Sequence, residues 1–247
     1  MILAAALDLD GTMIGPDETI STAVQEAVVR LAARIPVFIA TGREPADVLR
    51  YSKELGLTTP QLCDGGANIL DPVRGVSVWN APLGPANAEA VVTRLREMGS
   101  AFVATHASGT ASTFDDVPNW DLIRVSALDL DETTAYALAE SFRGNKTMHV
   151  ILAVLPYNGL WAVDFTLAGV DKATGVSRVG NTLGVDPANI VAAGDSYNDL
   201  PMLMACGFGI AMGNAPEELK AIADFVAPTV EKDGLAIAIN DYVLPQL

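Results

Sequence analysis

Continuous apolar runs of strand length recur through the first third of the chain. Residues 2–7 and 36–40 are two such runs, and 61–69 holds a third, shorter signal. Short runs that are apolar throughout are typical of strands buried inside a sheet. The pattern therefore predicts three buried strands in this part of the chain.

Amphipathic stretches separate these runs. Apolar residues recur at helical spacing over 24–31, where Thr22 and Gln25 can form a capping box at the helix start. A second helix is expected from Pro45, a residue suited to the first turn, to Gly56 at its end. Strands that alternate with helices in this way predict an α/β fold, namely a doubly wound, Rossmann-like parallel sheet with right-handed crossovers.

The pattern changes after a break rich in proline and glycine at residues 80–85. Helix signals over 86–98 and 132–142 now combine with strand signals in an α+β order. The strand signals cover residues 101–105, 122–125, 148–155 and 160–167. This stretch therefore predicts a small unit of its own.

The first kind of alternation then returns, with a helix expected over 172–183 and a strand over 190–193. A chain that leaves an α/β pattern and comes back to it is typical of a domain insertion. We predict a core domain formed by residues 1–82 and 168–247, with an inserted α+β cap domain at 83–167.

Composition limits the classes of partner. Of the 247 residues, 50% are hydrophobic and 18% charged, which allows a full core. The formal net charge of −15 argues against nucleic acid and anionic membranes, because both need a basic surface. A small anionic substrate remains compatible with this charge, since screening acts over about 8 Å and local cations dominate within that distance. No apolar stretch approaches the roughly 20 residues that span a bilayer.

The two cysteines, Cys63 and Cys206, are far apart and lack a Cys-x-x-Cys spacing. They therefore predict neither a disulfide framework nor a zinc site, and free buried thiols are the expected state. Together with an opening run that lacks a basic leader, they favour a reducing, cytoplasmic setting.

The most informative polar residues directly follow the first apolar run, in the sequence DLDGT. Asp8 and Asp10 are two apart, and residues two apart in a strand share a face. Ligands of open parallel sheets bind outside the carboxyl ends of the strands. Two neighbouring carboxylates repel unless a cation or a proton separates them, so the pair predicts a bound metal, a carboxyl of raised pKa, or both.

Three more polar signals fall where strands should end or helices begin. They are Thr41-Gly42-Arg43, Lys172 and the run GDSYND at 194–199. Each alone is weak, because a Thr-Gly-Arg after a strand is more often a plain turn and helix start, and a lone lysine is usually a solvated surface charge. Their order, a carboxylate pair followed by a hydroxyl, an amine and a second acidic pair, favours one common site.

These motifs resemble those of the haloacid dehalogenase superfamily, and within it the Cof-like phosphatases that carry a type IIB cap. DLDGT resembles the first family motif, TGR the second, Lys172 the third and GDSYND the fourth. The segment 209–236 is similar to the tail that follows the fourth motif. The chain departs from the family at Ala173, where glycine is usual, and at CDGGA, where Asn-Gly-Ala is usual.

The resemblance implies a magnesium-dependent phosphatase that acts through an aspartyl-phosphate. Asp8 is then the nucleophile, and an ionised carboxylate needs no base to activate it. Asp10 is the implied acid and base, which protonates the leaving oxygen and later activates water. The implied magnesium ligands are Asp8, the backbone carbonyl of Asp10 and Asp195, with Asp199 beside them or bound through water.

The same resemblance implies a phosphate site. Thr41 and the backbone amide of Gly42 are the expected hydrogen-bond donors, Lys172 supplies a fixed positive charge, and Asn198 orients phosphate or metal ligands. Arg43 completes the expected substrate contacts. The implied partners are small phosphorylated metabolites, either sugar phosphates and similar phosphomonoesters or phosphoglycolate-type acids, whereas the oligomeric state is not readable.

Other functions fit the sequence less well. Gly194-Asp195-Ser196 also occurs in esterases of the GDS-Leu type, but these need a later histidine, and the last one here is His149. Receiver domains of signalling systems form an aspartyl-phosphate too, yet they lack an inserted unit and a second carboxylate two residues after the first. A dehalogenase would share Asp8 but would lack Asp10. A phosphotransfer module without turnover is kept as the lesser alternative.

Overall fold

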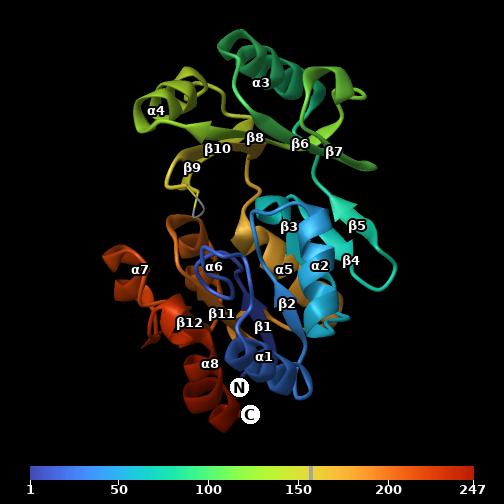
Figure 1. Cartoon of the computed structure of the whole chain (residues 1–247). Helices are drawn as coiled ribbons and strands as arrows, with labels where there is room; N and C mark the ends of the chain where they lie inside the picture. Colours follow the sequence, from blue (N-terminus) through green and yellow to red (C-terminus); the bar gives the residue numbers. More distant parts are fainter. Residues whose placement is uncertain (156–157) are drawn as a thin grey trace. The chain divides into compact units, whose positions relative to one another are not determined.

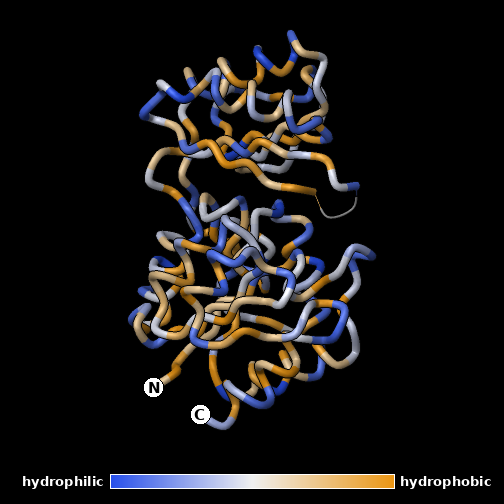
Figure 2. The backbone as a smooth tube through the Cα atoms, turned by 90° about the vertical axis from the view of Figure 1, so that its left-hand side faces the viewer, coloured by the Kyte–Doolittle hydropathy of each residue, from blue (hydrophilic) through white to orange (hydrophobic). Residues whose placement is uncertain are grey.

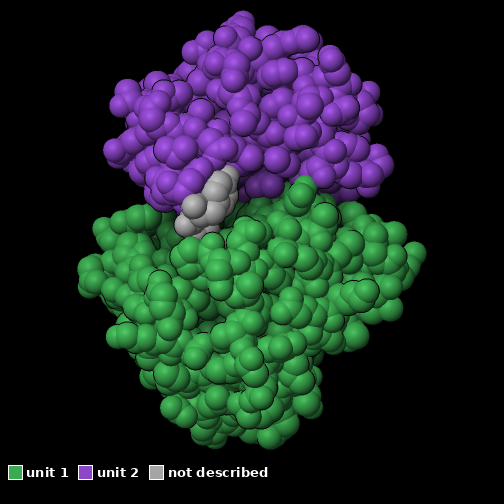
Figure 3. All heavy atoms as spheres, in the orientation of Figure 1, with its two compact units in different colours: residues 1–78, 171–247 green, residues 79–170 purple. Residues whose placement is uncertain are grey.

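The computed structural model describes residues 1–155 and 158–247 (Figure 1). Pro156 and Tyr157, which belong to the expected cap, lie outside the described residues. The chain divides into two compact units, coloured separately in Figure 3. Unit 1 combines Met1–Val78 with Asp171–Leu247, and unit 2 is Trp79–Val170. The roles of catalytic core and cap for these units stay predictions.

A five-stranded parallel sheet forms the centre of unit 1, in the order β13-β12-β11-β1-β2. Its strands are β1 (Ala4–Leu7), β2 (Val37–Ile39), β11 (Ile190–Gly194), β12 (Phe208–Ala211) and β13 (Phe225–Val226). β1 is buried along its whole length, and hydrophobic segments, orange in Figure 2, run through the interior of this unit. The expected α/β fold is confirmed.

The three helices of unit 1 for which bounds were expected lie close to their expected positions. They are α1 (Thr22–Ala32), α2 (Pro45–Leu55) and α5 (Lys172–Leu183), and α6 (Leu200–Ala205), α7 (Glu217–Ile222) and α8 (Gly234–Ile237) follow later in the chain. The capping box expected from Thr22 and Gln25 is wrong, because Ser21 is the N-cap and its side chain accepts the N–H of Val24. Since Ser21 is itself a favoured cap, the helix needs no box one residue later.

The segment expected as a third buried strand is instead a hairpin. β3 (Gln61–Cys63) pairs antiparallel with β4 (Asn68–Asp71), and β5 (Val76–Asn80) completes a three-stranded sheet. Gly65 and Gly66 take positive φ angles in the turn, which glycine adopts without strain. A single parallel bridge between Ala40 and Leu62 joins this hairpin to the end of β2.

In the described residues of unit 2, one antiparallel sheet and two helices form an α+β arrangement. The antiparallel sheet has the order β7-β6-β8-β10-β9, and α3 and α4 pack against it. The elements are α3 (Pro85–Met98), β6 (Phe102–His106), β7 (Gly109–Ala111), β8 (Leu122–Leu130), α4 (Glu132–Ser141), β9 (Met148–Val154) and β10 (Trp161–Leu167). The strand expected at 122–125 is longer than the sequence signal, because polar residues in its second half obscure the apolar pattern.

Cys63 and Cys206 are both reduced thiols, as expected, and Cys63 is fully buried. Cys206 is partly buried, and this burial raises the pKa of its thiol to about 12. Among the residues that the structure describes, no helix is long and apolar enough to cross a membrane.

Candidate active site

Asp8 and Lys172 meet at the carboxyl end of the parallel sheet. Asp8 is the first residue after β1, and its backbone N–H donates to Ala193 of β11 at 3.0 Å. Lys172 is the first residue of α5, which is capped by the side chain of Asp171. The ammonium Nζ lies 2.7 Å from Asp8 Oδ1 and 2.6 Å from Asp199 Oδ1. The buried ammonium of Lys172 therefore connects Asp8, at the end of β1, with Asp199, in the loop after β11.

Asp199 is fully buried and fixed on both of its oxygens. While Oδ1 accepts from Lys172, Oδ2 accepts the backbone N–H groups of Asp195 at 3.1 Å and Ser196 at 3.0 Å. A carboxylate that accepts this many hydrogen bonds is held in one orientation. Asp199 thus fixes both the lysine and the loop that follows β11.

Asp195 is oriented by Asn214, a residue that sequence analysis did not single out. Asn214 Nδ2 donates to Asp195 Oδ2 at 2.9 Å and to the carbonyl of Gly11 at 3.0 Å, while its Oδ1 accepts the N–H of Val230. Gly11 has φ of +70°, and a Cβ placed there would lie 1.9 Å from Asp195 Oδ2. The glycine of the DLDGT motif therefore makes room for Asp195.

We call Asp8, Lys172, Asp195 and Asp199 the buried cluster, in which Asp195 is partly buried and the other three are buried. The three carboxylates each offer an oxygen, and these oxygens lie within 4.8 Å of one another. Burial, and then the charge of Asp199, raises the pKa of Asp8 well above its usual range and that of Asp195 to about 7. Three carboxylates with one lysine leave an excess of two negative charges, which a divalent cation would balance.

The donor set of this cluster suits magnesium. It offers carboxylate oxygens, which hard divalent cations prefer. Because both oxygens of Asp199 already accept protein hydrogen bonds, Asp8 and Asp195 are better suited to contact an ion directly. The residues therefore fit the expected cofactor, with Asp199 in a supporting position.

Lys172 carries a positive charge within this cluster. Burial on its own would lower the pKa of Lys172, but the charges of Asp199 and Asp8 and their hydrogen bonds outweigh it and raise that pKa. The ammonium is therefore protonated at neutral pH. It places a fixed positive charge directly beside the carboxylate of Asp8.

The side chain of Asp10 has a different partner from that of Asp8. Arg43 donates to both of its oxygens, from Nε to Oδ2 at 2.9 Å and from Nη2 to Oδ1 at 2.8 Å. The carboxylate of Asp10 is about one-third exposed, whereas that of Asp8 is buried. Arg43 thus binds the candidate acid, and its expected contact with substrate stays a prediction.

Thr41 and Gly42 follow the end of β2, as expected. Thr41 is buried, its Oγ1 accepts the backbone N–H of Arg43 at 3.2 Å, and the hydroxyl can still donate its own proton. Around Gly42 there is open space, because a Cβ there would meet nothing within 4 Å. Asn198 Oδ1 accepts a hydrogen bond from the Ser196 hydroxyl at 2.8 Å.

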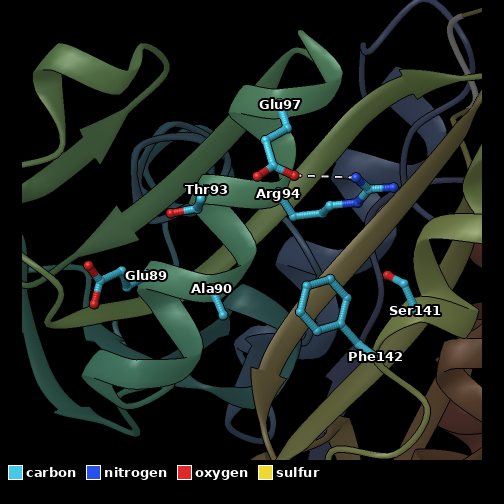
Figure 4. A pocket seen from close by; sticks show the side chains of 7 residues that line it. All are labelled: Glu89, Ala90, Thr93, Arg94, Glu97, Ser141 and Phe142. Atoms are coloured by element: carbon cyan, nitrogen blue, oxygen red, sulfur yellow. Dashed lines mark hydrogen bonds and ion pairs between the residues drawn. The ribbon is translucent and has the colours of Figure 1, made fainter.

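A hollow of about 530 Å³ lies on unit 2 and has no part in this chemistry (Figure 4). It is lined by α3 and the end of α4, through Glu89, Ala90, Thr93, Arg94, Glu97, Ser141 and Phe142. Within it Arg94 pairs with Glu97 at 3.4 Å, and both side chains are exposed. None of the candidate site residues lines it, so it is a surface depression rather than the active site.

Comparison with known proteins identifies the family. The model of a family described as haloacid dehalogenase-like hydrolase matches residues 5–151 and 153–239. The chain belongs to this family. The superfamily and the Cof-like resemblance expected from the motifs are thereby confirmed, and so is the enzyme class, a phosphoric monoester hydrolase.

Individual relatives of this haloacid dehalogenase-like hydrolase align along nearly the whole chain. The putative phosphatase YkrA of Bacillus subtilis is 30% identical, with 95% of each chain covered. The phosphoglycolate phosphatase of Natronomonas pharaonis is 28% identical, with 97% of each chain covered. A haloacid dehalogenase-like hydrolase from Bacteroides thetaiotaomicron has the same fold, with a TM-score of 0.84 at 21% identity over 98% of this chain and 99% of that one.

Proposed function

We propose that this hydrolase cleaves small phosphomonoesters with the help of Mg²⁺, through an aspartyl-phosphate on Asp8. The observation that carries the proposal is the buried cluster. In it Lys172 lies 2.7 Å from Asp8, and three carboxylates offer oxygens that a divalent cation could bind. When bound, the metal would neutralise negative charge on the phosphate and on Asp8. Asp8 and Asp195 are the side chains that would hold it.

In the first step, a carboxylate oxygen of Asp8 bonds to phosphorus and the bond from phosphorus to the ester oxygen breaks. Asp8 attacks as the carboxylate. Burial and the charge of Asp199 raise its pKa, Lys172 opposes that rise, and a bound divalent cation would lower the pKa further. Asp10 gives its proton to the leaving oxygen, so that a neutral alcohol departs. Asp10 lies two residues after Asp8 and is partly exposed, which allows it to exchange protons with solvent.

In the second step, water replaces Asp8 on phosphorus. Asp10, now a carboxylate, takes a proton from the attacking water. The bond between phosphorus and the Asp8 oxygen breaks, which releases inorganic phosphate and restores the carboxylate. The same side chain therefore acts once as an acid and once as a base.

Fixed donors support the phosphoryl group in both steps. Negative charge on its equatorial oxygens is stabilised by preorganised donors, and this term dominates phosphoryl transfer. We assign this task to Lys172, the Thr41 hydroxyl and the backbone amide of Gly42. Asn198 is assigned to the orientation of the loop after β11, through its contact with Ser196.

Sugar phosphates and similar small esters are the proposed substrates. Phosphoglycolate-type acids are the second candidate class, because the relative from Natronomonas pharaonis is named a phosphoglycolate phosphatase. A signalling module without turnover is the third, and it lacks a relative among the proteins compared above.

Phosphate release from a panel of esters tests the proposal. Hexose phosphates, phosphoglycolate and p-nitrophenyl phosphate are each measured with magnesium and with EDTA. We expect turnover that needs the metal, and a phosphoryl group trapped on Asp8 after acid quench of a rapid reaction. Stoichiometric labelling of Asp8 without further phosphate release would favour the signalling module, and turnover by Asp8→Asn would remove the mechanism.

A further inference from the structure

Arg43 is surrounded by three carboxylates, although only one of them belongs to the proposed chemistry. Besides both oxygens of Asp10, it contacts Glu18 Oε1 from Nη2 at 2.6 Å and Asp47 Oδ2 from Nη1 at 3.1 Å. We call Asp10, Glu18, Arg43 and Asp47 the Arg43 cluster. All four residues lie in unit 1.

Glu18 reaches Arg43 from an unusual backbone conformation. Its φ is +58°, in the left-handed region that side chains other than glycine, asparagine and aspartate rarely adopt. Its N–H donates to the carbonyl of Gly15 at 3.0 Å, and its carbonyl accepts from the Tyr51 hydroxyl at 2.9 Å. Arg50 in turn donates to that hydroxyl at 2.7 Å. The surrounding contacts therefore hold Glu18 in a costly conformation that glycine or asparagine would accept more readily.

We propose that Glu18 is a positioning residue for Asp10 and acts through Arg43. The guanidinium is planar and rigid, so the acceptors that bind its N–H groups set its orientation. Nη2 is shared between Asp10 Oδ1 and Glu18 Oε1, and Asp47 holds the opposite nitrogen. Because Glu18 fixes Nη2 and Asp47 fixes Nη1, Arg43 donates to Asp10 from Nε and Nη2 in one orientation.

Stability does not account for this contact. The side chain of Glu18 is 42% exposed, and ion pairs open to water contribute little to the free energy of folding. A strained backbone held only for such a pair would be a net cost. Orientation is a different matter, because acid and base catalysis depends on placing a carboxyl within fractions of an ångström of the productive position.

The inference rests on the proposed function and adds to it a residue that places the catalytic acid. Asp10 must protonate the leaving oxygen in the step that forms the aspartyl-phosphate, and kcat/KM reports on that step. An alkoxide needs this proton, whereas p-nitrophenolate leaves as a stable anion. A loosened Asp10 should therefore damage kcat/KM for an alkyl phosphate far more than for p-nitrophenyl phosphate.

Glu18→Asn is the variant that separates backbone strain from the ion pair. Asparagine tolerates the left-handed conformation but is one methylene too short to reach Arg43 as Glu18 does. We expect an unchanged or higher Tm, with kcat/KM about tenfold or more lower for an alkyl phosphate and within about twofold of wild type for p-nitrophenyl phosphate. Asp10→Asn should give the same selective loss, only larger.

Glu26→Gln serves as the matched control, because it removes an exposed carboxylate from α1 of the same unit. It should leave both substrates unaffected. Equal losses on the two esters in Glu18→Asn, or no loss on either, would overturn the positioning role. Wild-type protein that hydrolyses neither ester would instead refute the proposed function on which the inference rests, so the two failures are distinguishable.

Discussion

The buried cluster and the Arg43 cluster have the same charges and different access to water. Each holds one cation and three carboxylates, which gives a formal excess of two negative charges. Lys172 is 2% exposed and Arg43 15% exposed, while the carboxylates bound to Arg43 are about one-third exposed or more. Solvent screens the excess around Arg43, but it reaches the buried cluster far less.

This difference in exposure to water explains why the buried cluster, and not the Arg43 cluster, is suited to hold a metal. Where water screens the charges, no bound cation is needed to balance them, and the carboxylates serve to orient a guanidinium. Where burial removes water, the same excess raises the pKa of Asp8 and Asp195, so that a proton or a cation must compensate. Burial, rather than the number of acidic residues, therefore distinguishes a cluster that suits a metal ion from one that orients a guanidinium.

The largest expected effect is on the nucleophile in the buried cluster. Asp8→Asn keeps the size and one hydrogen-bonding oxygen for Lys172, but the amide cannot form the aspartyl-phosphate. Turnover of every ester should fall below detection, while circular dichroism shows a folded protein. Residual turnover near the wild-type rate, without phosphoryl transfer to residue 8, would mean that the cluster binds ions without reacting.

The next effect concerns the cation of the same cluster. Lys172→Ala removes the charge beside Asp8 and leaves two carboxylates without their shared donor. We expect kcat/KM to fall by about 10²- to 10³-fold, the usual size for loss of one transition-state donor. Steady-state kinetics on p-nitrophenyl phosphate with saturating magnesium measures this. A loss under about threefold would assign Lys172 a purely structural role.

Asn214 tests how far the buried cluster depends on support from a distant segment. Asn214→Ala frees Asp195 from its donor and should weaken metal binding by roughly 10- to 100-fold, as loss of groups that orient metal ligands does. The magnesium concentration for half-maximal activity should rise accordingly, while activity at saturating metal recovers. A lower maximal rate with unchanged metal dependence would show that Asn214 acts on something other than the ion.

The pH response should reveal the excess charge of the buried cluster. In the folded protein without metal, the pKa of Asp195 is about 7, above the ordinary value of about 3.9. The stability from this bound proton is complete below about pH 4 and is lost as pH rises to about 7. Since a metal competes with that proton, its affinity should rise about tenfold from pH 6 to pH 8.

Calorimetry and thermal melts measure this pH response directly. Magnesium titrations at pH 6 and pH 8 give the affinities, and the rise of Tm on adding the metal should be larger at pH 8. Equal affinities at the two pH values would show that Asp195 is already ionised in the free protein, and hence that burial does not set it apart from the Arg43 cluster.

Local patterns predicted the residues that follow strand ends. Asp8 and Asp195 follow apolar runs that mark strand ends, and Lys172 opens a helix, so their positions favoured one site at the shared edge of the sheet. Their roles were implied by the resemblance to a known family. The approximate bounds of α1, α2 and α5 were predictable as well, since capping and periodicity are encoded within a few residues. Features that depend on neighbouring residues, such as strand ends and helix starts, were thus predictable.

Contacts between distant segments were not predictable in the same way. Asn214 bonds to a carbonyl 203 positions earlier, and nothing near it marks that partner. Glu18 lies in an irregular loop without periodicity, so its strained backbone and its contact with Arg43 had no signal. Arg43 was expected to contact substrate because TGR resembles a family motif, and its bonds to three carboxylates had no signal in the spacing of the sequence.

The smallest expected effect lies at the outer side of the Arg43 cluster. Asp47→Asn removes one charge, but the amide oxygen still accepts from Nη1 of Arg43, and Asp10 and Glu18 keep their contacts. Asp47 also shares Arg50 with the Tyr51 hydroxyl, at a weak 3.5 Å contact. Because such exposed pairs are worth about 0.2 to 1 kcal/mol, we expect kcat/KM for an alkyl phosphate to fall by less than about fivefold. A loss as large as that of Glu18→Asn would show that Asp47 and Glu18 hold Arg43 jointly, and that water screens this cluster less than its exposure implies.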